Sequence, residues 1–197
     1  IEVAAVVAIT ATLAAVIVPI AVYKVKEGKL TAAKGDCQAI ANAITGFYKD
    51  TSQWPASSGA SLNYQHVLRS GTETGSLGTT HDPVGATTVW GEATAAKTDL
   101  LENHLVKDNP GGTAYAYLTA KLNWKGPYSE SMTKLDPWGN NYLVYVKAMH
   151  TATTGSSKQY GWIISAGPNA TLETKVTDSA IQGDDIGMML SAAESGH

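Results

Sequence analysis

This chain has almost no cysteine, and it has no excess of positive charge. Cys37 is the only cysteine among 197 residues, so no intramolecular disulfide can form and the sequence is not that of a disulfide-stapled secreted domain. The net charge is −3 and the sequence contains no basic patch or RNA-binding motif, so nucleic-acid binding is not predicted. The five histidines show no pair at the spacing typical of zinc ligands.

Charge is also scarce in the N-terminal segment. Residues 1–22 read IEVAAVVAITATLAAVIVPIAV, and Glu2 is their only charged residue. At about 1.5 Å per residue, such a helix crosses a hydrocarbon layer about 30 Å thick. A signal peptide has a basic start and a shorter apolar core, and a buried helix of this length needs a larger protein around it. Two interpretations remain: a plain membrane anchor, or a helix that leaves the membrane and packs against copies of itself.

Glu2 and Pro19 favour the second interpretation. A buried carboxylate is costly without a positive partner, and the α-amine of a neighbouring copy is such a partner. Glu2 would then neutralise that amine and set the axial register of a polymer. Pro19 removes a backbone donor and is predicted to kink or locally melt the helix just before it. Small residues let helices approach closely: Ala4, Ala5, Ala8, Ala11, Ala14 and Ala15.

The following residues predict an amphipathic continuation of the same helix over residues 24–54. After four closely spaced lysines, apolar residues recur at steps of three and four. This stripe consists of Leu30, Ala33, Cys37, Ile40, Ala41, Ile44, Phe47 and Tyr48. We expect the stripe to pack on a globular domain, with Cys37 as a buried structural thiol. Trp54-Pro55 follows a polar turn and is expected to lie beyond the end of the helix.

Residues 55–123 are predicted to form a loop-rich variable region, because Ser, Thr, Gly and Ala dominate most of it. Short helices are predicted around Ser61–Arg69 and over Thr98–Lys107, the second capped by one of its first two residues. His81-Asp82 lies in this region with serines nearby, but nothing in the spacing indicates a hydrolytic triad. The residue types instead favour an exposed, solvated loop.

The C-terminal part, residues 124–197, is predicted to form a small antiparallel sheet and a polar loop. Tyr142–Val146 and Trp162–Ile164 are β-rich runs bounded by turn-forming residues, and the polar segment between them predicts a hairpin. Asp136–Gly139 has the residue types of a tight turn. The predicted fold class is therefore α+β. A long N-terminal α-helix, apolar over residues 1–23, packs through its second half on this sheet.

Several motifs stand in the order found in a known family. Glu2 and Pro19 are separated by seventeen positions within an apolar helix. The C-terminal part contains four further motifs: WKGPY at 124–128, DPWGNNY at 136–142, SAGPN at 165–169 and GDDI at 183–186. Together they closely resemble the motifs of type IV pilins, and most closely those of the major pseudopilin of type II secretion.

The resemblance covers the helix up to Pro55 and nearly all of residues 124–186, whereas residues 56–120 lie outside it. In that family the acid is normally the fifth mature residue and here it is the second, so we expect three residues to precede Ile1. The family implies a filament with the apolar helices bundled in its core and an inner-membrane location before assembly. It also implies a prepilin peptidase and an inner-membrane assembly platform as partners.

The resemblance further implies a calcium ion in the last loop. The matching ligands are the backbone carbonyl of Ala166 and the side chains of Asn169, Asp184 and Asp185, with Glu173 and Asp178 as further candidates. Calcium takes six to eight oxygen ligands, and a metal that closes a flexible loop could replace the missing disulfide. The alternative is that these acids are merely solvated. Asn169 also begins a glycosylation sequon, which metal binding at that side chain would exclude.

The sequence therefore predicts a structural protein, not an enzyme: the repeating, self-associating subunit of a helical filament. The motifs favour a periplasmic pseudopilus of type II secretion. The long inserted loop and threonine-rich surface favour instead an extracellular type IV pilus used in adhesion, motility or DNA uptake. A membrane-anchored exported hydrolase is a third alternative, which predicts a nucleophile and a base in contact within a pocket.

Overall fold

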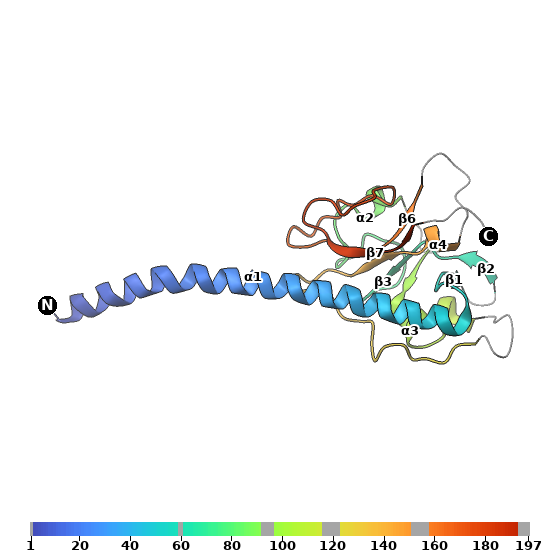
Figure 1. Ribbon diagram of the computed structural model, residues 1–197, viewed down its shortest axis with the longest axis horizontal. Helices are drawn as coiled ribbons and strands as arrows, with labels where there is room; N and C mark the ends of the chain where they lie inside the picture. The colour runs from blue at the N-terminus through green and yellow to red at the C-terminus, as the bar shows by residue number, and fades with distance from the viewer. Residues whose placement is uncertain (1, 59–60, 92–96, 116–122, 151–157, 193–197) are drawn as a thin grey trace.

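The computed structural model describes residues 2–58, 61–91, 97–115, 123–150 and 158–192, and the molecule has a projecting and a globular part (Figure 1). Helix α1 spans Glu2–Thr51, so its 50 residues extend over about 75 Å. Its first half projects alone, and its second half lies along the globular part (Figure 1). The globular part is built on a five-stranded sheet, which confirms an α+β fold with a long N-terminal helix.

Helix α1 stays helical through Pro19 and through Gly28 and Gly35. Proline deprives the carbonyl of Ala15 of its helical donor, but one missing bond bends a helix without ending it. The predicted melting before Pro19 is thus not present in the single chain, where the helix curves gently (Figure 1).

The second half of α1 packs through the predicted apolar stripe. Leu30 and Tyr48, at the two ends of the stripe, stay 38% and 40% exposed. The buried members are Ala33, Cys37, Ile40, Ala41, Ile44 and Phe47, joined by Ala43. The helix ends at Thr51, and Ser52 takes a left-handed conformation with φ 54°. Trp54-Pro55 therefore lies beyond the helix, as predicted.

The sheet has the strand order β4-β3-β5-β6-β7. The strands are β3 (Val67–Arg69), β4 (Thr98–Leu100), β5 (Leu143–Tyr145), β6 (Tyr160–Ser165) and β7 (Ile186–Ala192). The predicted hairpin is confirmed, because β5 and β6 pair antiparallel. The sheet as a whole is mixed, not antiparallel, because β3 and β4 pair in parallel. These two strands come from the region predicted to be loop-rich, and residues 70–97 cross over between them.

Both short helices predicted in residues 55–123 need correction. Ser61–Arg69 forms strand β2 (Ser61–Tyr64) and strand β3, because Val67–Arg69 is a fully buried run paired on both sides. Thr98–Leu100 is strand β4, and helix α3 begins only at Leu101 and ends at Leu105. Its N-cap is Leu100, which makes no side-chain cap hydrogen bond. The remaining elements are β1 (Ser57–Ser58), α2 (Ala86–Val89), η2 (Pro110–Gly112) and α4 (Lys147–His150).

Hydrophobic cores lie on both faces of the sheet, because successive side chains of a strand point to opposite faces. Leu68, Val144 and Ile163 belong to the core under α1. The alternate residues of the same strands, such as Leu143 and Ile164, belong to a second core with Trp90 and Leu172. Helix α1 is therefore fixed to one face of the sheet, and residues 77–90 and the loop after β6 cover the other.

Candidate assembly helix and candidate calcium loop

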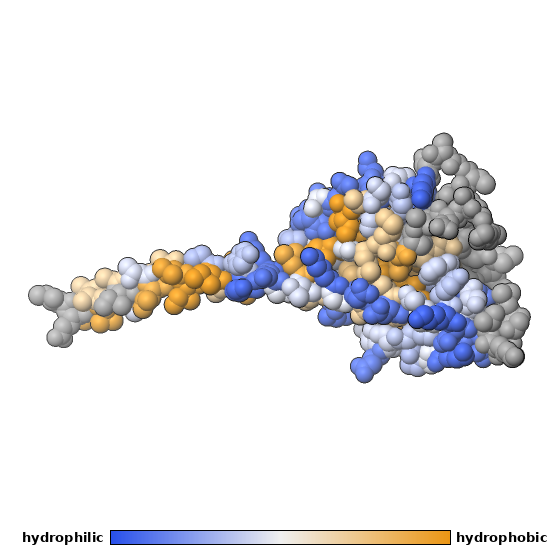
Figure 2. Space-filling view, viewed as in Figure 1, coloured by the Kyte–Doolittle hydropathy of each residue, from blue (hydrophilic) through white to orange (hydrophobic). Residues whose placement is uncertain are grey.

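The projecting half of α1 exposes a continuous apolar surface. Its large side chains are between 50% and 78% exposed: Val3, Val6, Val7, Leu13, Val16, Ile17, Val18, Ile20 and Val22. Figure 2 shows this half as hydrophobic, followed by a hydrophilic zone where α1 reaches the globular part. Among the described residues, α1 alone is long and apolar enough to cross a membrane, and none of its most apolar window is buried. Such a surface needs a cover of lipid or protein.

The polar side chains of this half make their hydrogen bonds within the helix. Thr10 Oγ1 donates to the carbonyl of Val6 at 3.0 Å, and Thr12 Oγ1 donates to that of Ala8 at 3.1 Å. Hydroxyls bonded in this way can enter an apolar environment without losing a partner. Glu2 is the first residue of α1, and its side chain lies outside the described part of the chain.

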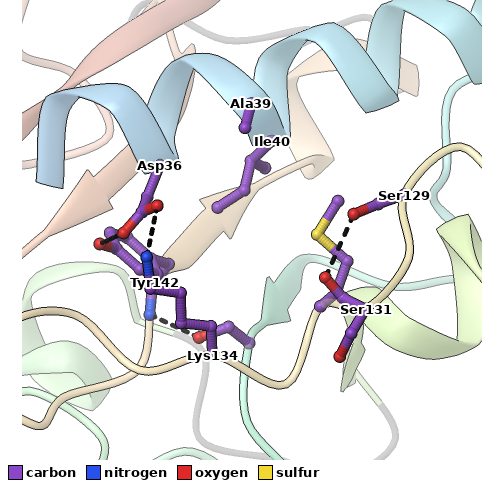
Figure 3. Close-up of a pocket in the computed structure, with 9 residues that line it drawn as sticks. Asp36, Ala39, Ile40, Ser129, Ser131, Lys134 and Tyr142 are labelled. Carbon is purple, nitrogen blue, oxygen red and sulfur yellow. Dashed lines mark hydrogen bonds and ion pairs between the residues drawn. The ribbon is translucent and has the colours of Figure 1, made fainter. Parts of the chain in front are cut away.

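Two carboxylates join α1 to the globular part. Asp36 accepts hydrogen bonds from Tyr142 Oη at 2.7 Å and from Lys134 Nζ at 2.8 Å (Figure 3). Burial, and then the bond to Asp36, raise the pKa of the Tyr142 phenol well above its usual range. At the penultimate residue of the helix, Asp50 accepts hydrogen bonds from Lys125 and Tyr128. These contacts therefore tie the docked half of α1 to the globular part at two points.

The cavity beside Asp36 is small. It has a volume of about 80 Å³ and is lined by residues of α1 and of the 129–134 segment (Figure 3). Pockets for small-molecule ligands usually span about 300–1,000 Å³. The nearby thiol of Cys37 is buried, which raises its pKa to about 12. This confirms a structural thiol, because reactivity requires an exposed thiolate.

Four of the six candidate calcium ligands form one cluster between β6 and β7. The Asn169 N–H donates to Asp184 Oδ2 at 3.1 Å, and the Asp184 N–H donates to Glu173 Oε2 at 3.0 Å. Asp185 Oδ2 accepts from the N–H groups of Glu173 and Thr174 at 3.0 and 2.7 Å. The loop is thus folded around its own carboxylates.

The backbone of this loop approaches the carboxylates closely. A Cβ at Gly183 would lie 1.5 Å from Glu173 Oε2, and one at Gly167 would lie 2.1 Å from the carbonyl oxygen of Asp184. Both glycines have positive φ, which a side chain would strain. The SAGPN and GDDI motifs therefore supply the glycines that the cluster requires.

Two oxygens in this cluster have no partner. Asp184 Oδ1 and Asp185 Oδ1 are buried and accept no hydrogen bond within the described structure. Burial raises the pKa of Asp185, so its charge is poorly compensated. No group of three His, Cys, Asp or Glu side chains suited to a metal is found among the described residues. Calcium also accepts amide and carbonyl oxygens. The side chain of Asn169 has an amide oxygen, and the buried Ala166 has a backbone carbonyl. The cluster thus offers the oxygen donor types that calcium takes, two of them without a hydrogen-bond donor among the described residues.

Asp178 occupies a different position from the other candidate ligands. Its Oδ2 accepts a hydrogen bond from the Lys175 N–H at 2.8 Å, within its own turn. Asn169 Oδ1 accepts from the Thr171 N–H at 2.6 Å, which orients the amide. The structure therefore brings together Asn169, Glu173, Asp184 and Asp185, and it gives Asp178 a local role.

The loop after β3 was predicted to be solvated. In the structure it instead contains buried side chains. Arg69 and Asp82 form an ion pair whose side chains are 1% and 0% exposed. His81 contacts Glu73 instead of Asp82, and Ser70 Oγ accepts a hydrogen bond from the Tyr142 N–H. These residues therefore do not form a hydrolytic relay. Sequence reasoning missed Arg69 and Glu73, because no local pattern pairs them with partners up to 13 residues away.

Comparison of the chain with protein-family models, with curated proteins and with solved structures gives no match.

Proposed function

We propose that this chain is the repeating subunit of a type IV-like helical filament, closest in kind to the major pseudopilin of type II secretion. The observation that carries the proposal is the projecting half of α1. It is apolar and uncovered, and it continues as one helix into a half that is firmly docked on a folded domain. Bundling the projecting halves of many copies would cover this surface and place the domains outside.

Glu2 and Pro19 have specific roles in this assembly. The carboxylate of Glu2 neutralises the α-amine of a neighbouring copy and fixes the axial register, because an unpaired charge in an apolar bundle is costly. Pro19 leaves one carbonyl without its helical donor, so the helix yields most easily before it when packed among neighbours. Before assembly the same half spans the inner membrane. A prepilin peptidase and a membrane assembly platform act on the chain there.

A calcium ion in the last loop is part of the proposal. Asp184 and Asp185 would hold it with their unpartnered oxygens, together with the amide of Asn169 and the carbonyl of Ala166. Glu173 would act mainly through the N–H of Asp184, to which it is already bonded. The ion would neutralise two buried carboxylates and tie the segment after β6 to the start of β7.

The direct test is cryo-electron microscopy of material sheared from native cells, combined with substitution of the acid. Filaments with α1 at their core are expected from the unmodified chain, and Glu2→Ala is expected to abolish or slow their assembly. Glu2→Asp keeps the charge and serves as the matched variant. Normal filaments from Glu2→Ala would exclude the role of Glu2, and extraction of the unmodified chain only as a detergent-bound monomer would indicate a plain anchor.

A surface pilus is the second candidate function. The described residues between 55 and 123 supply strands β3 and β4 of the five-stranded sheet, so the inserted region contributes to the folded domain, and a surface pilus would present such a region to the outside. Immunogold labelling of intact cells separates the two: long labelled fibres support a pilus, and their absence under native expression supports a pseudopilus. The exported-hydrolase alternative has less support, because Ser70, His81 and Asp82 each contact other groups.

A further inference from the structure

Positive charge is concentrated at the point where the apolar half of α1 ends. Residues 3–23 contain no charged side chain, and Lys24, Lys26 and Lys29 follow directly. Glu27 is the only acid among residues 24–35, so this zone has a net positive charge. Glu27 pairs with Lys24 at 2.8 Å, but both side chains are more than half exposed, and such pairs contribute little. Figure 2 shows the resulting hydrophilic zone between the projecting half of α1 and the globular part.

The three lysines are distributed around the helix. At 3.6 residues per turn, Lys26 and Lys29 lie about 200° and about 140° around the axis from Lys24. Lys24 and Lys26 are exposed, and Lys29 is half-buried. A flat protein surface would contact only one side of α1, whereas lipid headgroups surround a helix that crosses a leaflet. The distribution therefore favours lipid as the partner.

The height of the lysines above the apolar segment matches a headgroup layer. At about 1.5 Å per residue, they lie about 3, 6 and 10 Å beyond Val22 along the helix axis. A headgroup layer is about 5–8 Å thick, and the flexible stem of a lysine lets its ammonium group reach back towards the membrane. All three ammonium groups can thus reach lipid phosphates while Val22 stays in the hydrocarbon. Lys34, about 18 Å beyond Val22, lies outside this layer.

Two aromatic side chains lie at the same level as the lysines. Tyr23 is 65% exposed and directly follows the apolar run. Trp138 is half-buried on the globular part, and Lys29 Nζ lies 5.9 Å from the centroid of its ring. Asp136 fixes the turn that carries this ring, because it accepts hydrogen bonds from the Trp138 N–H at 2.9 Å and from Ser165 Oγ at 2.7 Å. Tyr and Trp are enriched where a protein meets the membrane–water interface.

We propose that Lys24, Lys26 and Lys29, with Tyr23 and Trp138 beside them, form a collar that binds the headgroup phosphates of anionic phospholipids. The collar acts in the leaflet that faces the globular part, and the inference rests on the membrane-spanning state in the proposed function. The lysines supply electrostatic attraction to the anionic surface, and the two rings fix the depth of the chain. The collar thus holds the globular part close to the membrane until the chain leaves it for the filament.

The test is native mass spectrometry of the full chain released from lipid nanodiscs that contain equal parts of phosphatidylglycerol and phosphatidylcholine. The masses count the lipids of each kind that the chain retains. We expect the unmodified chain to retain phosphatidylglycerol in at least about fivefold excess, the contribution of a single lysine near an anionic surface. The combined variant Lys24→Gln, Lys26→Gln, Lys29→Gln should retain the two lipids about equally.

The matched control combines Lys34→Gln, Lys49→Gln and Lys175→Gln. These lysines are also exposed, so the control removes the same charge outside the collar and should keep the preference for phosphatidylglycerol. Circular dichroism checks that both variants fold, as expected for substitutions of exposed or half-buried lysines.

Fluorescence quenching by lipids that carry bromine near the headgroup end of their acyl chains gives a second readout. Trp138→Phe should remove most of the quenching that the unmodified chain shows. Trp54→Phe is the control, because Trp54 lies beyond the far end of α1 and should not contribute.

Equal retention of the two lipids by the unmodified chain, or an unchanged preference in the folded collar variant, would overturn the inference alone. An unchanged lipid preference together with loss of filaments in the collar variant would overturn it too, and would assign the lysines to contacts between copies of the chain. Failure of the unmodified chain to enter nanodiscs would overturn both this inference and the membrane-spanning state in the proposed function.

Discussion

At the scale of single residues, the buried ion pair between Arg69 and Asp82 has the clearest energetic consequence. Asp82 Oδ2 accepts from the guanidinium and from the N–H groups of Gly78 and Thr79 at 2.9 and 3.0 Å. One carboxylate thus organises the turn that follows β3 and compensates a cation with almost no access to water. Removing it would leave a charged guanidinium alone in the interior.

We therefore expect Asp82→Ala to lower the free energy of unfolding by about 3–5 kcal/mol, the usual cost of breaking a buried pair on one side. Urea denaturation of the detergent-solubilised chain measures this change. The matched control is Glu27→Ala, which breaks the exposed Lys24–Glu27 pair and should cost at most about 0.5 kcal/mol. Equal urea midpoints for the two variants would show that losing Asp82 lowers the free energy of unfolding no more than losing an exposed carboxylate.

Because Asp185 is buried, we expect the stability of the folded protein to depend on pH. We expect bound calcium to reverse the direction of that dependence. Burial raises its pKa above the ordinary 3.8, so the folded state holds this proton more tightly than the unfolded state. Its contribution to stability is then greatest below pH 3.8 and falls as pH rises through the raised pKa. Calcium binds the charged form, so its stabilisation should grow with pH and reach about 2.7 kcal/mol at a hundred times Kd.

Differential scanning calorimetry across this pH range, with calcium and with chelator, measures both effects. Asp185→Asn should abolish the calcium response and flatten the pH dependence in chelator. Asp178→Asn is the matched control, because Asp178 bonds only within its own turn in the described contacts. Identical melting temperatures in calcium and in chelator at neutral pH would remove calcium from the proposed function.

At the scale of elements, the prediction from the sequence was right where the local spacing of apolar residues determines the structure. The stripe from Ala33 to Phe47 is buried as expected, because its spacing matches one face of a helix. Strand β7 was not predicted, since Gly187 and two methionines have weak β propensity and pairing with β6 decides their conformation. Strand β3 was predicted as helix for a similar reason: only its two neighbours in the sheet make it extended.

The candidate sites divide in the same way. Asn169, Asp184 and Asp185 were found because their motifs stand in a recognisable order. The buried pair of Arg69 and Asp82 was missed, because two residues thirteen positions apart in a loop leave no local pattern.

The two halves of α1 should respond oppositely to the loss of a large apolar side chain. Phe47 is fully buried and contacts the rings of Tyr115 and Tyr128, with centroids 5.0 and 5.7 Å away. Phe47→Ala should therefore cost about 3–5 kcal/mol of domain stability. Val16 is 61% exposed, so Val16→Ala should leave domain unfolding unchanged and weaken filament assembly. Urea denaturation and filament yield measure the two responses, and a destabilised domain in Val16→Ala would contradict the division.

At the scale of the whole molecule, the domain and the projecting helix are structurally independent. None of the most apolar window of α1 is buried against the rest of the chain, and the first buried residue of α1 within the described burial pattern is Ala33. The domain thus needs only the second half of α1 to complete its core. The first half of α1 buries none of its most apolar window against the domain, and in the proposed function its apolar surface is covered by the membrane or by the bundle.

A chain that begins at Lys24 should consequently be monomeric and soluble without detergent. Its free energy of unfolding should lie within about 0.5 kcal/mol of that of the full chain in detergent, because the removed residues bury no core surface. Sedimentation and urea denaturation measure both quantities, and the shortened chain should be absent from filaments when expressed beside the full chain. An unfolded or aggregated product would show instead that the projecting half supports the domain, and incorporation into filaments would show that contacts between domains, not the apolar helices, hold the polymer together.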